Sequence, residues 1–288
     1  MFWKLLKHDF RAVGRFWWIG AVVSVVASIC AAVLFRFFWG NIGNESEDLL
    51  LELISVCTIF MAFICIFAVA LSFVFTLILV YTRFYKNFFT DEGYLTFTLP
   101  VKRSTLFFSK IVNATAWYSL HIAVLIVSAL LFSLLVLPAE PSRFFINFYV
   151  FELVGELFAF LWQLVGAWLI AYIFEILLLA FVYMLYSILL VHFCITVGAV
   201  LAKKAKILLS IGIYYLISSV TQVLSEVVVI FGSSFVEAII NSMKNASEGA
   251  INAISALFIF LAILALAALG AMFYFVTNHL LHRKLNLS

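Results

Sequence analysis

The sequence contains few charged residues, and this scarcity excludes a soluble globular domain. Asp, Glu, Lys and Arg make up 11% of its 288 residues, whereas they make up about 25% of an average soluble domain. The mean hydropathy is +1.22 and 67% of the residues are hydrophobic, which is more apolar surface than one soluble core buries. The apolar runs are also unbroken, whereas strands of a membrane barrel alternate over about ten residues. The composition therefore predicts an all-α polytopic membrane protein.

Other absences exclude several kinds of chemistry. The four cysteines lie inside apolar runs, away from any CxxC or Cys/His cluster, at Cys30, Cys57, Cys65 and Cys194. We therefore expect neither a disulfide framework nor a metal site. The chain has no GxxxxGK[ST] sequence, so it contains no P-loop. It also has no HExxH or GxSxG motif, and we predict no catalytic residue and no cofactor in this chain.

Six apolar runs are each long enough to cross a bilayer, for which about 20 residues suffice. They cover residues 16–39, 49–82, 104–137, 164–202, 207–231 and 250–277. The second and third runs exceed this requirement, so we expect their helices to tilt or to project from the membrane. Residues 1–288 are predicted to form a single transmembrane domain that ends in a tail at 278–288.

The distribution of basic residues predicts the orientation, because Lys and Arg accumulate on the cytoplasmic side of membrane proteins. Fourteen of the seventeen Lys and Arg residues precede span 1, follow span 6 or lie between spans 2 and 3 or spans 4 and 5. The opposite side contains Arg36, Arg143 and Lys244, together with Glu45, Glu47, Asp48, Glu140, Glu237 and Glu248. Both termini are therefore predicted to be cytoplasmic.

Two segments do not fit a plain span. The apolar region from Phe144 to Ala202 is long enough for two crossings, but two crossings would reverse the orientation of everything after it. We favour one crossing that follows an outer interfacial or re-entrant helix at about 142–162, on which Glu152 and Glu156 share a face. Residues 232–249, between spans 5 and 6, are interpreted as two short re-entrant half-helices, with an ordinary surface loop as the alternative.

Residues 1–17 form a separate pattern before span 1. Apolar residues recur at spacings of three and four, at Trp3, Leu6, Phe10, Val13 and Trp17. The opposite face is basic and contains Lys4, Lys7, His8, Arg11 and Arg15. This pattern is typical of an amphipathic elbow helix in the inner interface, in contact with membrane lipid. A plain cytosolic extension of span 1 remains the alternative.

The polar segment FFTDEGYLTFTLPVKR at 88–103 separates spans 2 and 3. Thr90 is a suitable N-cap, and Asp91 and Glu92 fall in the first turn, where carboxylates are favourable. Pro100 prevents the helix from continuing, and Ser104 is expected to cap span 3. The segment therefore predicts a short cytoplasmic helix that packs on its own spans or on headgroups, or that docks to a cytosolic partner.

The segment NFFTDEGYLTFTLPVKRSTLFFSK at 87–110 resembles a cytoplasmic loop of bacterial ABC-2 type (type V exporter fold) ABC transporter permeases. The tail HLLHRKLNLS at 279–288 resembles the same family more weakly. The resemblance implies six spans, an amphipathic N-terminal helix and a re-entrant segment between spans 5 and 6. It also implies that the short helix is a coupling helix, which binds an ATPase subunit through the positions Thr90, Asp91, Glu92, Gly93, Tyr94 and Leu95.

The resemblance also implies the partners. Because the chain has no P-loop, Mg-ATP would bind to a separate nucleotide-binding subunit. The N-terminal helix would provide a second contact with that subunit. Six spans form half of a pathway in this family, so a second permease, identical or paralogous, would complete it. We expect no nucleic-acid partner.

Ionisable residues within spans are candidates for function. Glu175 and Glu226 are expected near the outer side, where they would form an outer gate or a site for a cationic substrate, or be solvated at the interface. Ser218, Gln222 and Ser225 form a polar stripe that leads toward Glu226 and indicates a substrate pathway, or hydrogen bonding between helices. His121 and His192 are interpreted as packing residues.

Three classes of function are compatible with these patterns. The first is a permease of an ATP-driven exporter in a bacterial cytoplasmic membrane, which carries a hydrophobic or amphipathic substrate such as a peptide. The second is an intramembrane enzyme, a protease or a lipid-modifying transferase, although its paired motifs are absent from this sequence. The third is a non-transporting membrane sensor or anchor for an ATPase. We favour the first.

Overall fold

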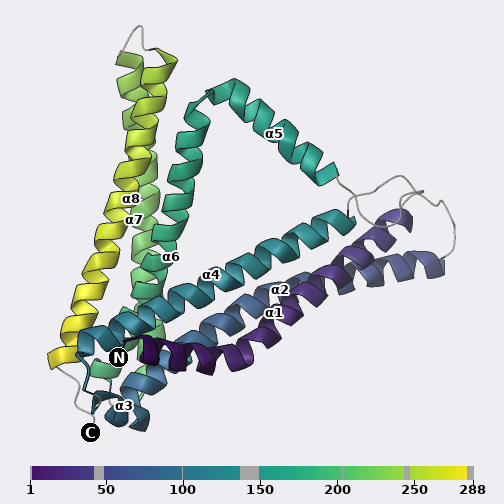
Figure 1. Cartoon of the computed structure of the whole chain (residues 1–288). Helices are drawn as coiled ribbons and strands as arrows, with labels where there is room; N and C mark the ends of the chain where they lie inside the picture. Colours follow the sequence, from purple (N-terminus) through teal and green to yellow (C-terminus); the bar gives the residue numbers. More distant parts are fainter. Residues whose placement is uncertain are drawn as a thin grey trace. The chain divides into compact units, whose positions relative to one another are not determined.

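In the residues that the structure describes, the fold is a set of eight α-helices, seen in a computed structural model (Figure 1). The structure describes residues 2–41, 49–98, 100–136, 149–202, 204–242 and 247–283, and no strand occurs among them. The helices are α1 (Phe2–Asn41), α2 (Leu49–Phe89), α3 (Asp91–Phe97), α4 (Arg103–Val136), α5 (Tyr149–Val165), α6 (Trp168–Leu201), α7 (Lys206–Ser242) and α8 (Glu248–Arg283).

Six of these helices are long and apolar enough to cross a membrane, which confirms the predicted number of spans for the described residues. They are α1, α2, α4, α6, α7 and α8. Each has at least 34 residues, or about 50 Å at 1.5 Å per residue, against a hydrocarbon core of about 30 Å. The long helices therefore have room to tilt or to extend past the hydrocarbon.

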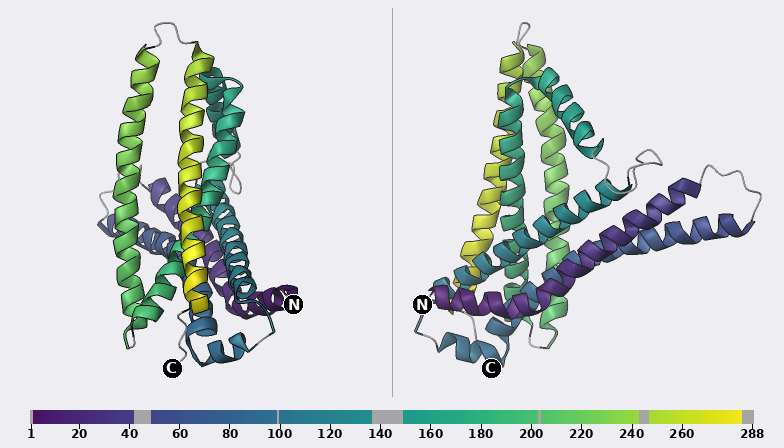
Figure 2. Two further views of the ribbon diagram at one scale, coloured as in Figure 1. Left: turned by 90° about the vertical axis from the view of Figure 1, so that its left-hand side faces the viewer. Right: turned by 45° about the vertical axis from the view of Figure 1, so that its right-hand side comes forward.

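Helix boundaries differ from the prediction at several places. Residues 1–17 were expected to form a separate helix, but α1 is continuous from Phe2 to Asn41. Figures 1 and 2 show its first turns at an angle to the rest of the same helix. Likewise α7 continues past residue 231 to Ser242, so the first half of the expected re-entrant segment is a continuation of the span. The rest of that segment at 243–246, the start of the 142–162 helix and the tail at 284–288 lie outside the described residues.

A glycine separates α5 from α6. Gly166 has a φ of +63°, in the left-handed region that favours glycine. Its N–H donates to the Trp162 carbonyl at 2.8 Å, and its own carbonyl accepts from Leu169 N–H at 3.1 Å. This turn makes α5 a separate helix of 17 residues, as the sequence led us to expect for much of 142–162, and places the start of the fourth span at Trp168.

The chain divides into two compact units, and each is described by itself. The first, which we call the α1/α2/α4 unit, comprises Trp3–Arg83 and Val112–Ala159. The second, which we call the α6–α8 unit, comprises Met1–Phe2, Phe84–Ile111 and Phe160–Ser288 and so includes α3. The single transmembrane domain expected from the sequence stays a prediction.

The interior of the α1/α2/α4 unit contains a hydrogen-bonded polar cluster. His121 in α4 is fully buried, with Nε2 at 3.2 Å from Ser72 Oγ and Nδ1 at 3.0 Å from Thr76 Oγ1. Ser72 also hydrogen-bonds Ser24 of α1. Trp17 and Phe73 contact the imidazole ring. The packing role predicted for His121 is therefore confirmed, because hydrogen bonds across helices replace the water that such groups would otherwise need.

In the α6–α8 unit, α6 packs against both α7 and α8. Tyr186, Leu190 and Cys194 of α6 pack with Phe273 of α8 in its core. Where α6 approaches the start of α7, Gly198 faces Ser210 so closely that a Cβ on Gly198 would lie 2.8 Å from the Ser210 backbone nitrogen. A residue without a side chain is therefore needed at this crossing.

Candidate functional site

The candidate site is α3, the short helix between the second and third predicted spans. Thr90 occupies the N-cap position with extended backbone angles, as expected, and the Gly93 N–H donates to its carbonyl at 2.7 Å. The Thr90 hydroxyl, however, does not cap α3. It donates to the Lys86 carbonyl at 2.6 Å, one turn earlier in α2, an alternative that short hydroxyl side chains often adopt. Ser104 does not cap α4 either, because that helix already begins at Arg103.

One side of α3 packs tightly against the end of α2. Gly93 is buried, and a Cβ at this position would lie 2.9 Å from the Phe88 carbonyl oxygen and 3.0 Å from its carbon. The Phe97 ring packs edge-on against the Phe88 ring, with centroids 5.6 Å apart. Gly93 therefore lets α3 fold back closely onto α2, and Phe97 fixes its far end.

Arg103, at the first position of α4, connects α3 with the end of α8. Its guanidinium lies 5.1 Å from the centre of the Phe97 ring, a cation–π distance. Its Nη1 donates to the Leu281 carbonyl at 3.0 Å and to the His282 carbonyl at 3.1 Å. These carbonyls belong to the last turn of α8, where acceptors lack partners within the helix. The neighbouring helices α3 and α4 and the distant helix α8 are thus connected by one arginine.

The other side of α3 is exposed. Tyr94 and Leu95 have relative exposures of 66% and 68%, and Asp91 and Glu92 are exposed beside them. All six predicted coupling positions therefore lie on one element, which presents two large apolar and two acidic side chains on a firmly held support. Tyr94, Leu95, Phe97 and Leu99 were all expected to make apolar contacts. Phe97 does so, Tyr94 and Leu95 are exposed instead, and Leu99 lies outside the described residues.

Replacing Arg103 with Leu should loosen α3 and the end of α8 together, because both lose the same guanidinium. We expect faster backbone hydrogen exchange at 91–98 and 278–282, and a loss of about 1–3 kcal/mol, typical for hydrogen bonds made by a charged group. Lys102→Leu is the matched control, since Lys102 is exposed and adjacent. Equal exchange in the two variants would contradict this role for Arg103.

An aromatic core supports α3 from inside the same unit. The Phe84 ring lies 4.2 Å from the ring of the fully buried His192, and Phe107 stacks on Tyr274 at 5.4 Å. His192 Nδ1 donates to the Ile188 carbonyl at 2.6 Å. His192 is therefore a packing residue, as predicted. The sequence did not single out Phe84 or Phe107, because a phenylalanine among 33 others gives no distinguishing signal.

The residues predicted for a pathway do not form one cluster in the described structure. On α7, Gln222 Nε2 donates to Glu226 Oε1 at 3.4 Å, and both side chains are exposed together with Ser225, while Ser218 is half-buried. Glu226 is also followed by 16 further residues of α7, so it lies near the middle of that helix and not at an end.

Glu175 belongs to a different group, at the start of α6. Tyr172, one turn earlier, donates its hydroxyl to the Asn252 backbone carbonyl or to Asn252 Oδ1 of α8, each at 3.2 Å. One Glu175 carboxylate oxygen is buried and has no hydrogen-bond partner among the described residues. Tyr172 and Asn252 were missed from the sequence, because each is a single polar residue at the end of an apolar run.

The predicted interfacial residues of α1 are exposed. Lys4, Lys7, Arg11 and Arg15 point away from the helices that α1 packs on, and Trp3 is 77% exposed. The sequence predicted no role for Asp9. It is 3% exposed, and its Oδ1 lies 3.9 Å from Arg83 Nε of α2.

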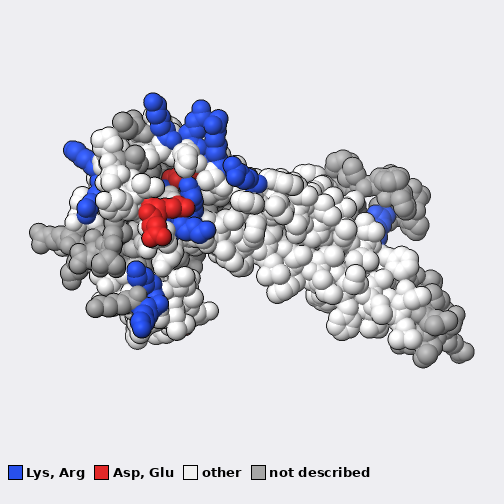
Figure 3. Space-filling model, turned by 90° about the horizontal axis from the view of Figure 1, so that it is seen from below, with Lys and Arg blue, Asp and Glu red and all other residues white. Residues whose placement is uncertain are grey.

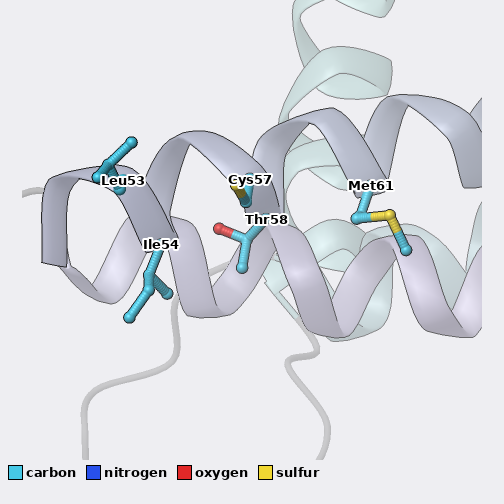
Figure 4. Close-up of a pocket in the computed structure, with 5 residues that line it drawn as sticks. All are labelled: Leu53, Ile54, Cys57, Thr58 and Met61. Atoms are coloured by element: carbon cyan, nitrogen blue, oxygen red, sulfur yellow. The ribbon is translucent and has the colours of Figure 1, made fainter. Parts of the chain in front are cut away.

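Two further features of the described part of the chain bear on ligand and metal binding. A shallow apolar hollow on α2 is lined by Leu53, Ile54, Cys57, Thr58 and Met61 (Figure 4). Its residues all come from three turns of one helix, so it offers no convergent polar groups for a ligand. No group of three or more His, Cys, Asp or Glu side chains gathers there as a metal site, and the four cysteines are free thiols. Comparison of the chain with known protein families, with curated proteins and with solved structures found no match.

Proposed function

We propose that this chain is the membrane subunit of an ATP-driven exporter, and that α3 is the surface on which a separate ATPase subunit docks. The observation that carries the proposal is the two-sided construction of α3. Its exposed side offers Tyr94 and Leu95 beside the acidic Asp91 and Glu92. On its other side, Gly93 and Phe97 pack on the end of α2, and Arg103 of α4 connects Phe97 to the end of α8. An exposed apolar pair on a rigid support is what a docking surface needs.

The connections of α3 favour a coupling role over simple attachment. α3 is joined to α2 and α4 by one residue and by five, respectively, and both are membrane-crossing helices. A displacement of α3 would therefore move the ends of two spans directly. ATP would bind to the partner, and its closure would be transmitted through α3 to open and close a pathway. The resemblance of 87–110 to ABC-2 permeases points to the same arrangement.

The rest of the proposal follows from this assignment. α3 and both termini lie in the cytoplasm of a bacterial cell, and residues 1–17 and α5 lie along the membrane interface. A second copy or a paralogue completes the pathway. The polar face of α7 and the Glu175 group contribute to that pathway or to its outer gate, and the substrate is hydrophobic or amphipathic, with peptides as the first class to test.

Replacing Tyr94 and Leu95 with Ala tests the docking surface. The tagged protein is purified from its native membranes with a non-hydrolysable ATP analogue, the analogue is washed out, and ATPase activity in the eluate is then measured with ATP. We expect the copurifying ATPase activity to be at least tenfold lower for the double variant than for the wild type. Truncating a central docking residue costs about 2 kcal/mol or more of binding free energy.

The chain provides a closely matched control for this experiment. Tyr215 and Leu216 are the same residue pair on α7, and each is 66% exposed. Their double Ala variant should retain the ATPase. If the Tyr94 and Leu95 variant also retains it, the docking assignment is wrong. If the wild type binds an ATPase but export assays show no transport of hydrophobic peptides, lipids or drugs, the chain is an anchor for that ATPase.

A further inference from the structure

The first turns of α1 carry an exposed face made of basic side chains only. We define the basic face of α1 as Lys4, Lys7, His8, Arg11 and Arg15, all of which are exposed. The single acidic residue of α1, Asp9, does not lie on this face. Lys7 and Arg11 each stand two residues from Asp9, about 200° around the helix at 3.6 residues per turn. The basic face is therefore on the side of α1 opposite to Asp9.

The side that contains Asp9 is engaged with the rest of the α1/α2/α4 unit. Asp9 lies 3.9 Å from Arg83 Nε, and Val13 is fully covered. The Phe10 ring stacks on Trp117 of α4, with ring centroids 4.3 Å apart. A Cβ on Gly14 would lie 3.1 Å from the same indole ring. These contacts fix the rotation of α1 about its axis. The basic face consequently keeps one direction, away from the helices.

The continuity of α1 keeps this face close to a membrane surface. No break separates Arg15 from the spanning part of the helix, and the basic residues occupy Lys4 to Arg15, about 17 Å of helix at 1.5 Å per residue. Figures 1 and 2 show these first turns at an angle to the rest of α1. When the rest of α1 crosses the bilayer, its first turns lie next to the bilayer surface. Away from the gathered charged side chains, Figure 3 shows a long stretch of uncharged surface with one small basic patch toward its far end.

We infer that the basic face of α1 binds the headgroups of anionic phospholipids. Anionic headgroups carry the complementary charge and lie at the bilayer surface, next to the first turns of α1. Each Lys or Arg near such a surface strengthens binding roughly fivefold. Trp3, Phe16 and Trp18 are exposed around the same turns, and aromatic rings prefer the headgroup region. The inference does not rest on the proposed function, because it requires neither an ATPase nor a transported substrate.

Lipid retention by the full-length protein tests the inference. The protein is equilibrated in detergent micelles with equimolar phosphatidylglycerol and phosphatidylcholine, separated by gel filtration, and its bound lipids are quantified. We expect the wild type to retain several-fold more phosphatidylglycerol than phosphatidylcholine, and this excess to fall as salt is raised. Replacing Lys4, Lys7, Arg11 and Arg15 together with Gln should bring the ratio close to one.

Two controls make the outcome decisive. Lys86→Gln with Lys102→Gln removes two exposed basic residues outside the face and should leave the lipid ratio unchanged. Thermal unfolding in pure phosphatidylcholine nanodiscs should be the same for all variants, because the four substituted side chains are exposed. An unchanged ratio in the fourfold variant would overturn the inference. So would a fourfold variant that retains phosphatidylglycerol but loses copurifying ATPase activity, since the face would then contact a protein.

Discussion

Replacing Gly93 with Val should detach α3 from the end of α2 while leaving the spans folded. The new Cβ would lie 2.9 Å from the Phe88 carbonyl oxygen and 3.0 Å from the carbonyl carbon. These are backbone atoms at the end of a helix, so they cannot rotate away as a side chain could. Overpacking of this kind costs about 1–3 kcal/mol, and the helix-propensity gain over glycine recovers only part of it. α3 should relieve the clash by moving, because it has only seven residues.

Hydrogen exchange measured by mass spectrometry checks this result without reference to any partner. We expect exchange at 91–98 to rise at least tenfold in the Gly93→Val protein, while exchange in α6 and α8 remains as in the wild type. Gly249→Val is the control, because nothing lies within 4 Å of the corresponding Cβ position. Normal protection of α3 in Gly93→Val would contradict the packing described for Gly93.

The Gly93→Val variant also tests whether the close packing of α3, apart from its exposed side chains, is needed for its proposed role. Gly93 is buried, so its side cannot be touched by a docked subunit, whereas Tyr94 and Leu95 point outward. If α3 couples an ATPase to the spans, Gly93→Val should reduce copurifying ATPase activity and ATP-dependent export although no exposed docking side chain has changed. Loss of protection at α3 with full export would show that the rigidity of α3 is unimportant and would remove the main support for coupling.

The sequence predicted the spans well because crossing a bilayer is a requirement on consecutive residues. Every backbone polar group in hydrocarbon must be satisfied within its own segment, so length and hydropathy alone find the six helices. α3 was found by the same local reasoning, from Thr90 and the acidic first turn to Pro100. Local reasoning also explains the error at Thr90. Its hydroxyl can cap α3 or donate to the Lys86 carbonyl, and the sequence does not indicate which of the two it does.

Contacts between distant residues were not predictable in this way. Arg103 bonds carbonyls of Leu281 and His282, almost 180 positions later, and backbone acceptors carry no sequence signal. Asp9 did leave a signal that was missed. It is the single acid in a basic segment, and Asp9, Val13, Gly20, Ser24 and Ser28 repeat at helical spacing on the buried side of α1. That stripe crosses the expected boundary at residue 17, which indicates one continuous packed helix.

Gly198→Ala and Gly212→Ala should change stability in opposite directions, although both add one methyl group to a helix of the α6–α8 unit. At Gly198 the new Cβ would lie 2.1 Å from Ser210 Oγ, 2.8 Å from its backbone nitrogen and 2.9 Å from its Cα. Rotation of the hydroxyl would relieve the first contact but not the other two. α6 and α7 must therefore separate, at a cost of about 1–3 kcal/mol or more.

At Gly212, two residues further along α7, nothing lies within 4 Å of the Cβ position. Alanine there should stabilise the helix by up to about 1 kcal/mol, because it lowers backbone entropy in the unfolded chain without meeting any atom. Unfolding followed by intrinsic fluorescence in one detergent should show a midpoint several degrees lower for Gly198→Ala and slightly higher for Gly212→Ala. A neutral Gly198→Ala would mean that α6 and α7 do not cross at Ser210. Destabilisation by Gly212→Ala would mean that another helix, from this chain or from a second copy, covers that side of α7.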